Sequence, residues 1–141
     1  ILPDLLKKAL KLESVSSPFD IVFSHNDLLP ANFIQDQEKI WLIDWEYAGF
    51  NTPLFDLGGL ASNNEFTEKE EEGLLENYFE KKLSCEVFIK YKAIKCAFLL
   101  RETMWSMVSE ITSNIDFDYR SYTADNLSKF NKAFNEEFKI N

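Results

Sequence analysis

A short stretch in the first third of the chain gathers residue types that bind metal ions and transfer protons. His25 and Asp27 are followed by Asn32, and Asp44 comes at the end of an apolar run. A carboxylate within reach of a hydroxyl group can orient it and take its proton, so Asp27 is the candidate general base. Asn32 and Asp44 supply an amide and a carboxylate oxygen, the hard ligands that magnesium prefers. We expect His25 to hold the loop by hydrogen bonding rather than to react.

The elements around these residues indicate how they converge. Three short apolar segments are typical of strands: 21–23, 32–34 and 40–43. The polar turn at 35–39 makes the last two a β-hairpin. Asn32 and Asp44 flank the two strands of this hairpin, so we expect their side chains to converge on one ion.

The rest of the chain is predicted to be mainly helical. Helices are expected over five segments: 3–12, 54–61, 67–83, 84–111 and 119–138. Thr67 and Glu70 match a capping box, which marks the start of the third helix. Loops are expected at 14–18 and 49–53. The predicted fold class is α+β and mostly α, with a small β-hairpin region followed by a helical bundle.

Composition and charge exclude several classes of partner. The net charge is -9 and Lys and Arg form no cluster, which argues against nucleic acid and anionic membrane surfaces as partners. Apolar runs are too short to span a bilayer, and the start of the chain lacks a signal-peptide pattern. Cys85 and Cys96 have no metal-site spacing, so we expect buried free thiols and a cytoplasmic protein. The oligomeric state stays open.

The motif resembles part of a known superfamily. H-x-D-x-x-x-x-N, followed by a strand-terminal Asp, is similar to the catalytic loop and metal-binding Asp of protein-kinase-like enzymes. Residues 43–47 read Ile-Asp-Trp-Glu-Tyr, where protein kinases have Asp-Phe-Gly. With Asn51 and the Phe55–Asp56 pair, they resemble the choline and ethanolamine kinase pattern. The implied fold is the C-terminal lobe of a protein-kinase-like fold.

This resemblance implies an activity and assigns further site residues. The implied reaction is phosphorylation of the hydroxyl group of choline or a related amino alcohol, with ATP as co-substrate and Mg2+ as cofactor. Glu46 matches a carboxylate that lies beside the magnesium site in that family. Asp56 matches a residue that supports the catalytic loop through hydrogen bonds.

The resemblance continues toward the C-terminus and implies an acceptor pocket. Trp105, Tyr119 and Tyr122 lie in segments similar to those that wall the choline pocket, and aromatic faces bind quaternary ammonium groups. Aromatic residues at helical spacing also form ordinary cores, so both interpretations stay open. Glu102 stands where eukaryotic choline kinases carry a second Trp, and its carboxylate could attract an amine. Asn63 stands where the family has an acidic residue.

The resemblance covers one lobe only. We expect residues 1–65 to form the catalytic loop and metal-binding hairpin, and residues 66–141 the helical acceptor-binding part. A Gly-rich loop, and a strand Lys paired with a helical Glu, are not found before His25. Because the chain opens on Ile1, we expect a longer native protein, with the N-terminal nucleotide lobe absent here and little activity in the isolated chain.

Two alternative functions remain open from the sequence. The acceptor could be an aminoglycoside, thiamine or a sugar-like compound, since Glu102 replaces a Trp of the eukaryotic pattern. The chain could also be a non-catalytic binding module derived from a kinase. The intact Asp27, Asn32 and Asp44 favour a working enzyme over that second alternative.

Overall fold

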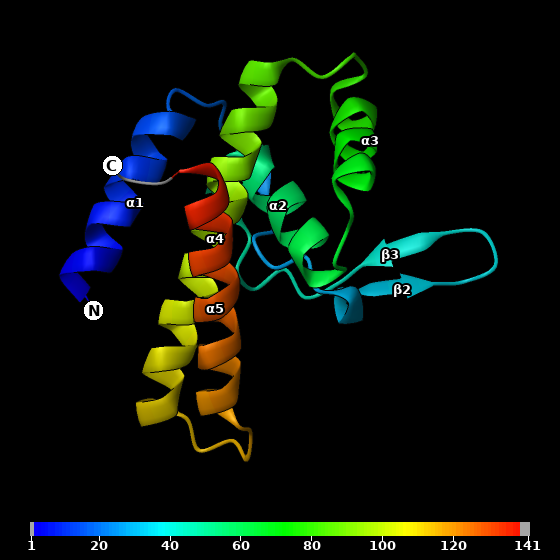
Figure 1. The fold of residues 1–141 in the computed structure, drawn as a ribbon. Helices are drawn as coiled ribbons and strands as arrows, with labels where there is room; N and C mark the ends of the chain where they lie inside the picture. Colours follow the sequence, from blue (N-terminus) through cyan, green and yellow to red (C-terminus); the bar gives the residue numbers. More distant parts are fainter. Residues whose placement is uncertain (1, 139–141) are drawn as a thin grey trace.

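A computed structural model describes residues 2–138 of the protein (Figure 1). The helices within this range are α1 (Leu2–Ser16), α2 (Pro53–Asn63), α3 (Glu68–Phe79), α4 (Cys85–Thr112) and α5 (Tyr119–Glu137). The strands are β1 (Val22–Ser24), β2 (Phe33–Gln35), β3 (Ile40–Leu42) and β4 (Gly49–Asn51), and a 3-10 turn covers Pro30–Asn32. The predicted mostly helical α+β class is therefore confirmed.

The strands form two separate antiparallel pairs. β2 and β3 make the predicted hairpin, with Ile34 opposite Trp41, and the hairpin projects away from the helices (Figure 1). β1 pairs with β4, with Phe23 opposite Phe50. The prediction of a loop at 49–53 was wrong in its first part, because the pairing partner of β4 is distant in sequence and local residue preferences do not reveal it.

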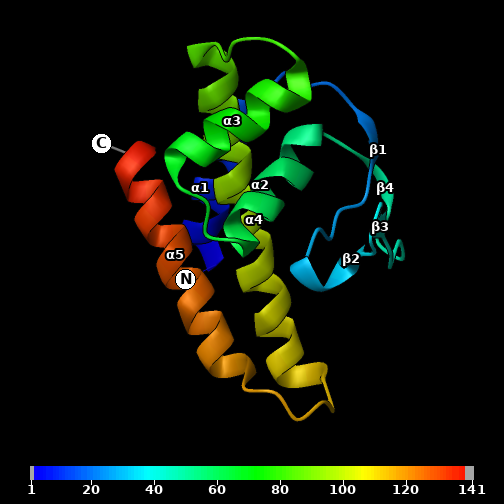
Figure 2. The ribbon, with the colours of Figure 1, turned by 90° about the vertical axis from the view of Figure 1, so that its right-hand side faces the viewer.

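Helix α4 is the central element of the helical part (Figure 2). One core cluster joins it to α1 and α5 through residues that include Leu12, Leu99 and Phe130. A second cluster joins it to α2 and α3 through residues that include Leu57 and Leu75. Buried residues of α4 therefore lie on two sides of the helix, among them Tyr91, Cys96 and Phe98.

Helix α2 approaches α4 closely through two adjacent glycines. A Cβ atom on Gly58 would lie 3.0 Å from the Lys95 Cα, and one on Gly59 would lie 2.8 Å from the Phe98 ring. Only residues without a side chain allow this spacing, since protein interiors are already close-packed. The two glycines therefore set how near α2, and the loops attached to it, can come to α4.

The helix boundaries partly follow the predictions. The capping box is confirmed: the Thr67 side chain accepts from the Glu70 N–H, and Glu70 accepts from the Thr67 N–H at 2.8 Å. Helix α3 ends four residues before the predicted end at 83, with Glu80 in a left-handed conformation (φ 52°). Helix α1 continues to Ser16, through part of the predicted loop at 14–18.

The two cysteines differ in their surroundings. Cys96 is buried, and burial raises the pKa of its thiol to about 12. Cys85 is exposed, against the prediction of a buried thiol, because it is the first residue of α4. Both are free thiols, as expected.

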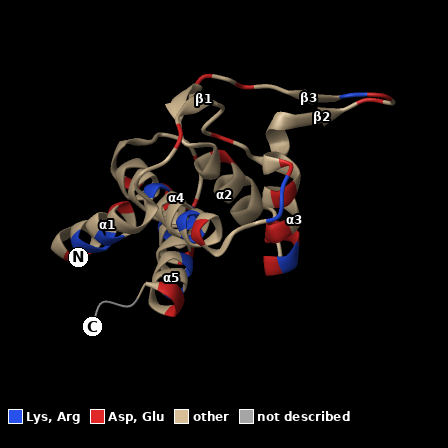
Figure 3. Cartoon of the chain, turned by 90° about the horizontal axis from the view of Figure 1, so that it is seen from above, with Lys and Arg blue, Asp and Glu red and all other residues tan. Residues whose placement is uncertain are grey.

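Charged side chains are spread over most elements rather than gathered on one face (Figure 3). Acidic residues mark the first turn of α3, where they complement the helix dipole. In the part of the chain that the structure describes, no helix is both long and apolar enough to cross a bilayer.

The contact between α2 and α4 yields a stability prediction. Gly58→Ala should lower the free energy of unfolding, because overpacking against the Lys95 backbone costs roughly 1–3 kcal/mol and exceeds the roughly 0.5–1 kcal/mol that Ala gains over Gly in a helix. Gly73→Ala in α3 is the matched control. No described atom lies within 4 Å of the added Cβ, so this variant should be slightly stabilised. Urea denaturation of both variants tests the pair, and equal effects would contradict it.

Candidate active site

One carboxylate holds the backbone of the predicted catalytic loop. Asp56, in the first turn of α2, accepts from the backbone N–H groups of His25 and Asn26, each at 2.7 Å. Hydrogen bonds to a charged acceptor are among the stronger ones in proteins. The loop that carries Asp27 is therefore tied directly to a helix of the core.

His25 connects the same loop to the strand end that carries Asp44. The ring is buried, and Nε2 lies 2.8 Å from the Ile43 carbonyl oxygen. A carbonyl only accepts, so Nε2 carries the proton. Trp45 packs edge-on against the ring at 4.7 Å. With Nε2–H used in this way, the contacts of His25 are those of a positioning residue.

Asn26 is a positioning residue that the sequence analysis missed. It has a left-handed backbone (φ 66°), a conformation that Asn adopts more readily than most residues. Its Nδ2 donates to the Tyr47 carbonyl at 3.0 Å, and its Oδ1 accepts from Asn51 at 2.9 Å. Asn26 thus joins the catalytic loop to the segment after Asp44. The long-range contacts that reveal this role are absent from local sequence patterns.

The hairpin brings the backbone segments of Asn32 and Asp44 close together. The Ile43 N–H donates to the Asn32 carbonyl at 3.0 Å, which places Asn32 beside the residue that precedes Asp44. The Asn32 Nδ2 donates to the Asp27 carbonyl at 2.9 Å, so its Oδ1 is the atom left for a ligand. The predicted base, Asp27, and the predicted ligands Asn32 and Asp44 therefore lie on directly connected segments.

The donor set suits magnesium rather than a transition metal. Asp44 and Glu46 are exposed carboxylates, and Asp44 has a left-handed backbone (φ 62°). Among residues 2–138, no group of three or more His, Cys, Asp or Glu side chains is placed to hold a metal. Magnesium commonly takes one or two protein carboxylates and keeps water and phosphate oxygens as its other ligands. These residues fit such an ion.

The three predicted acceptor-binding residues also lie together. Trp105 is 5.9 Å from Tyr119 and 6.5 Å from Tyr122, measured between ring centroids. Phe117, which was not predicted as a wall, lies 4.9 Å from Tyr119 and 5.7 Å from Tyr122. Trp105 is 44% exposed and Phe117 52% exposed, so this aromatic cluster of four residues is open to solvent rather than a closed core.

Polar contacts fix two of these rings. The Tyr122 hydroxyl donates to Glu102 Oε2 at 3.2 Å, and Ser113 Oγ donates to the Tyr119 hydroxyl at 3.0 Å. Burial raises the pKa of Tyr122, and the negative charge of Glu102 raises it further. Tyr122 therefore stays protonated and keeps its hydrogen bond to Glu102 near neutral pH.

A cavity of about 300 Å³ lies between the C-terminal end of α2, the middle of α4 and α5. Tyr122 and Asn63 both line it. Asn63 Nδ2 donates to the Leu28 carbonyl at 3.3 Å, next to Asp27. Asn63 thus contacts the catalytic loop from the position where the family pattern has an acidic residue.

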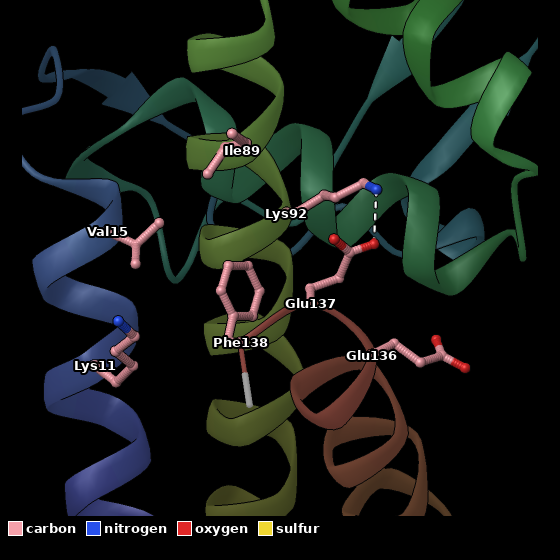
Figure 4. Close-up of a pocket in the computed structure, with 7 residues that line it drawn as sticks. All are labelled: Lys11, Val15, Ile89, Lys92, Glu136, Glu137 and Phe138. Carbon is pink, nitrogen blue, oxygen red and sulfur yellow. Dashed lines mark hydrogen bonds and ion pairs between the residues drawn. The ribbon is translucent and has the colours of Figure 1, made fainter. Parts of the chain in front are cut away.

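Another cavity, of about 520 Å³, lies between α1, α4 and the end of α5 (Figure 4). None of the described residues that line this cavity is a predicted site residue. Lys92 in this cavity pairs with Glu137 at 2.7 Å and with Glu68 at 3.6 Å (Figure 4 draws the first pair). These opposite charges satisfy one another, so we assign no chemistry to this cavity.

Comparisons with known proteins show the family of the chain. A sequence profile described as choline/ethanolamine kinase matches residues 3–90, more than half of the chain. The chain belongs to the choline/ethanolamine kinase family. A probable ethanolamine kinase of Arabidopsis thaliana is 31% identical over 121 residues, which cover 72% of this chain and 32% of that protein. The chain spans less than half the length of the curated relatives it matches.

Solved structures of the family share the fold. A choline/ethanolamine kinase family protein from Mesorhizobium loti superposes with a TM-score of 0.82 at 28% identity, covering 93% of this chain and 45% of that one. Choline kinase LicA from Streptococcus pneumoniae superposes with a TM-score of 0.75 at 30% identity, covering 96% and 48%. The predicted likeness to one lobe of a kinase-like fold is confirmed.

The role of Asp56 as an anchor yields a second prediction. Asp56→Asn should lower the free energy of unfolding by roughly 1.5–3 kcal/mol, because an amide offers one acceptor oxygen and turns an NH2 group toward a backbone N–H. Urea denaturation measures the change. Asp116→Asn, in the exposed loop before α5, is the control and should change stability by no more than about 0.5 kcal/mol. An unchanged midpoint for Asp56→Asn would show that the two hydrogen bonds are not what holds the loop.

Proposed function

We propose that the protein is an ATP- and Mg2+-dependent kinase that phosphorylates the hydroxyl group of choline or a related amino alcohol. One observation carries the proposal. The loop with Asp27 and the strand end with Asp44 are joined through the hydrogen bond from the Ile43 N–H to the Asn32 carbonyl. This connection supports a site in which a base and hard oxygen ligands would act together, as phosphoryl transfer requires of a protein.

The proposed mechanism assigns one task to each residue. Asp27 orients the acceptor hydroxyl and takes its proton while the oxygen attacks the terminal phosphorus of ATP, and ADP leaves. Asn32, Asp44 and Glu46 would hold magnesium, which when bound neutralises charge on the nucleotide phosphates. His25 and Asp56 keep the Asp27 loop in place through the hydrogen bonds described above.

The aromatic cluster supports an amino alcohol as the acceptor. Trp105, Tyr119 and Tyr122 present ring faces and edges at an open surface, and each cation–π contact contributes roughly 0.5–2 kcal/mol, depending on desolvation. The names of the related proteins, choline kinase and probable ethanolamine kinase, point to the same acceptor class. An aminoglycoside, thiamine or a sugar-like acceptor is the alternative that the assay below separates.

We also propose that two parts of the chain have different roles. Residues 1–65 would supply the catalytic loop and metal ligands, and residues 66–141 the acceptor wall. The phosphates of ATP would need further covering groups, such as a Gly-rich loop. The free thiols Cys85 and Cys96 suit a reducing compartment, which supports a cytoplasmic reaction.

The central test is the loss of turnover in an Asp27 variant. In the whole protein, Asp27→Asn should lower kcat about 10²–10⁴-fold, the range associated with a general base. ADP release would be measured with magnesium ATP and choline, ethanolamine, thiamine or kanamycin. Asp20→Asn is the control, because Asp20 is exposed and lies outside the site, and it should retain wild-type turnover.

The outcomes separate the alternatives. Turnover with choline or ethanolamine that collapses in Asp27→Asn supports the proposal. Turnover with only thiamine or kanamycin keeps the mechanism and changes the acceptor. Folded protein that binds nucleotide and phosphorylates none of the four would support the non-catalytic module.

Magnesium dependence gives a separate prediction. Asp44→Asn should raise the magnesium concentration for half-maximal activity at least about tenfold, since a neutral amide replaces a charged ligand. Titration of magnesium at fixed ATP measures this change. Glu38→Gln, an exposed residue in the turn of the hairpin, should leave the magnesium requirement unchanged. Equal magnesium curves for Asp44→Asn and wild type would remove Asp44 from the ligand set.

A further inference from the structure

Glu102 lies behind the aromatic cluster, and both of its oxygens are engaged. Oε2 accepts from the Tyr122 hydroxyl at 3.2 Å, and Oε1 pairs with the guanidinium of Arg101. The Glu102 side chain is only 12% exposed. The sequence suggested that this carboxylate could attract an amine directly, but in the structure its charge is already met by Arg101.

Arg101 is held in this pairing from its other side. Its guanidinium carbon lies 5.8 Å from the centre of the Tyr47 ring. Tyr47 belongs to the segment after Asp44, and its carbonyl accepts from Asn26. Arg101 therefore contacts both the segment after Asp44, through Tyr47, and the residue that holds Tyr122, through Glu102. Neighbouring residues on a helix point in different directions, so the contact with Tyr47 helps keep Arg101 turned toward Glu102.

The pairing of Glu102 with Arg101 affects which cations the aromatic cluster can bind. A primary ammonium carries N–H donors, and leaving them without acceptors in a partly buried site costs binding free energy. A quaternary ammonium has no such donors and needs only aromatic faces. With its charge neutralised by Arg101 and each oxygen already accepting a hydrogen bond, Glu102 is a weaker partner for an N–H donor bound at the cluster.

We propose that Arg101 is a specificity-determining residue that withholds Glu102 from the acceptor, so that the site favours a quaternary ammonium over a primary one. This inference rests on the proposed function, because it concerns the acceptor site of that reaction. It deepens the function by naming the preferred head group and the pair that sets the preference. Arg101 acts through Glu102 and the Tyr122 hydroxyl, so it is a positioning residue and not a catalytic one.

The test is a double-mutant cycle read by head-group binding. Calorimetry with tetramethylammonium and methylammonium chloride gives the ratio of their affinities for wild type, Arg101→Gln, Glu102→Gln and the double variant. Arg101→Gln frees the carboxylate and should shift the ratio about tenfold toward methylammonium, as expected for a charge-assisted hydrogen bond. Glu102→Gln alone should shift it less than about threefold, and the double variant should match Glu102→Gln. Arg101→Lys retains the cation and should restore the wild-type ratio.

Several results would overturn the inference. An unchanged ratio in folded Arg101→Gln would mean that the guanidinium does not restrain Glu102. A selective tenfold loss of methylammonium in Glu102→Gln would mean that the carboxylate already binds amines in the wild type. If neither cation binds to the wild type or to any variant, the aromatic cluster is not a cation-binding site. If Arg101→Gln fails to fold, Arg101→Met takes its place with the same expected shift, and Glu102→Gln still tests whether the carboxylate binds amines in the wild type.

The same variants separate this inference from the proposed function. In the whole protein, the ratio of KM values for ethanolamine and choline should follow the head-group affinities. If neither alcohol is phosphorylated by wild type, the proposed function fails, whereas the head-group ratios still decide the role of Arg101. If both are phosphorylated and the ratios do not move, the inference alone fails.

Discussion

The two hydrogen bonds from the backbone of His25 and Asn26 to Asp56 join the predicted catalytic loop to the folded core. A loop segment with a left-handed residue is not held by regular secondary structure, so its shape must be imposed by contacts from elsewhere. Asp56 can impose it because α2 is itself fixed against α4 by the close approach at Gly58. The position of Asp27 thus depends on helix packing as well as on its own neighbours.

The same dependence extends to the acceptor side. Helix α4 carries the α2 contact in its N-terminal half and Trp105 in its C-terminal half, so one rigid element relates the two ends of the site. Two polar links reinforce this relation. Asn63 contacts the backbone of the catalytic loop, and Arg101 lies against Tyr47 while it pairs with Glu102. The first contact ties the loop to α2, and the second ties the segment after Asp44 to α4.

Two residues of the site, Asn26 and Asp44, have left-handed backbones, which non-glycine residues adopt uncommonly. Asn and Asp tolerate this conformation better than most residues, and here the surrounding hydrogen bonds stabilise it. Asn26 is held by Tyr47 and Asn51. The local strain is therefore concentrated where the predicted base and metal ligand must be positioned, and the packed helices offset it.

Sequence patterns were sufficient for features that depend on local spacing. They predicted the hairpin, the helical second half, the capping box at Thr67 and the family, because periodicity, turn residues and a short motif are all local signals. They also nominated Asp27 and its neighbours, whose roles stay predictions.

Sequence patterns missed β4, the connecting role of Asn26 and the neutralisation of Glu102 by Arg101. β4 and Asn26 depend on partners more than 20 positions away, and Arg101 is turned toward Glu102 by the distant Tyr47 ring. Only the tertiary structure decides which distant groups meet, because that depends on how the helices pack.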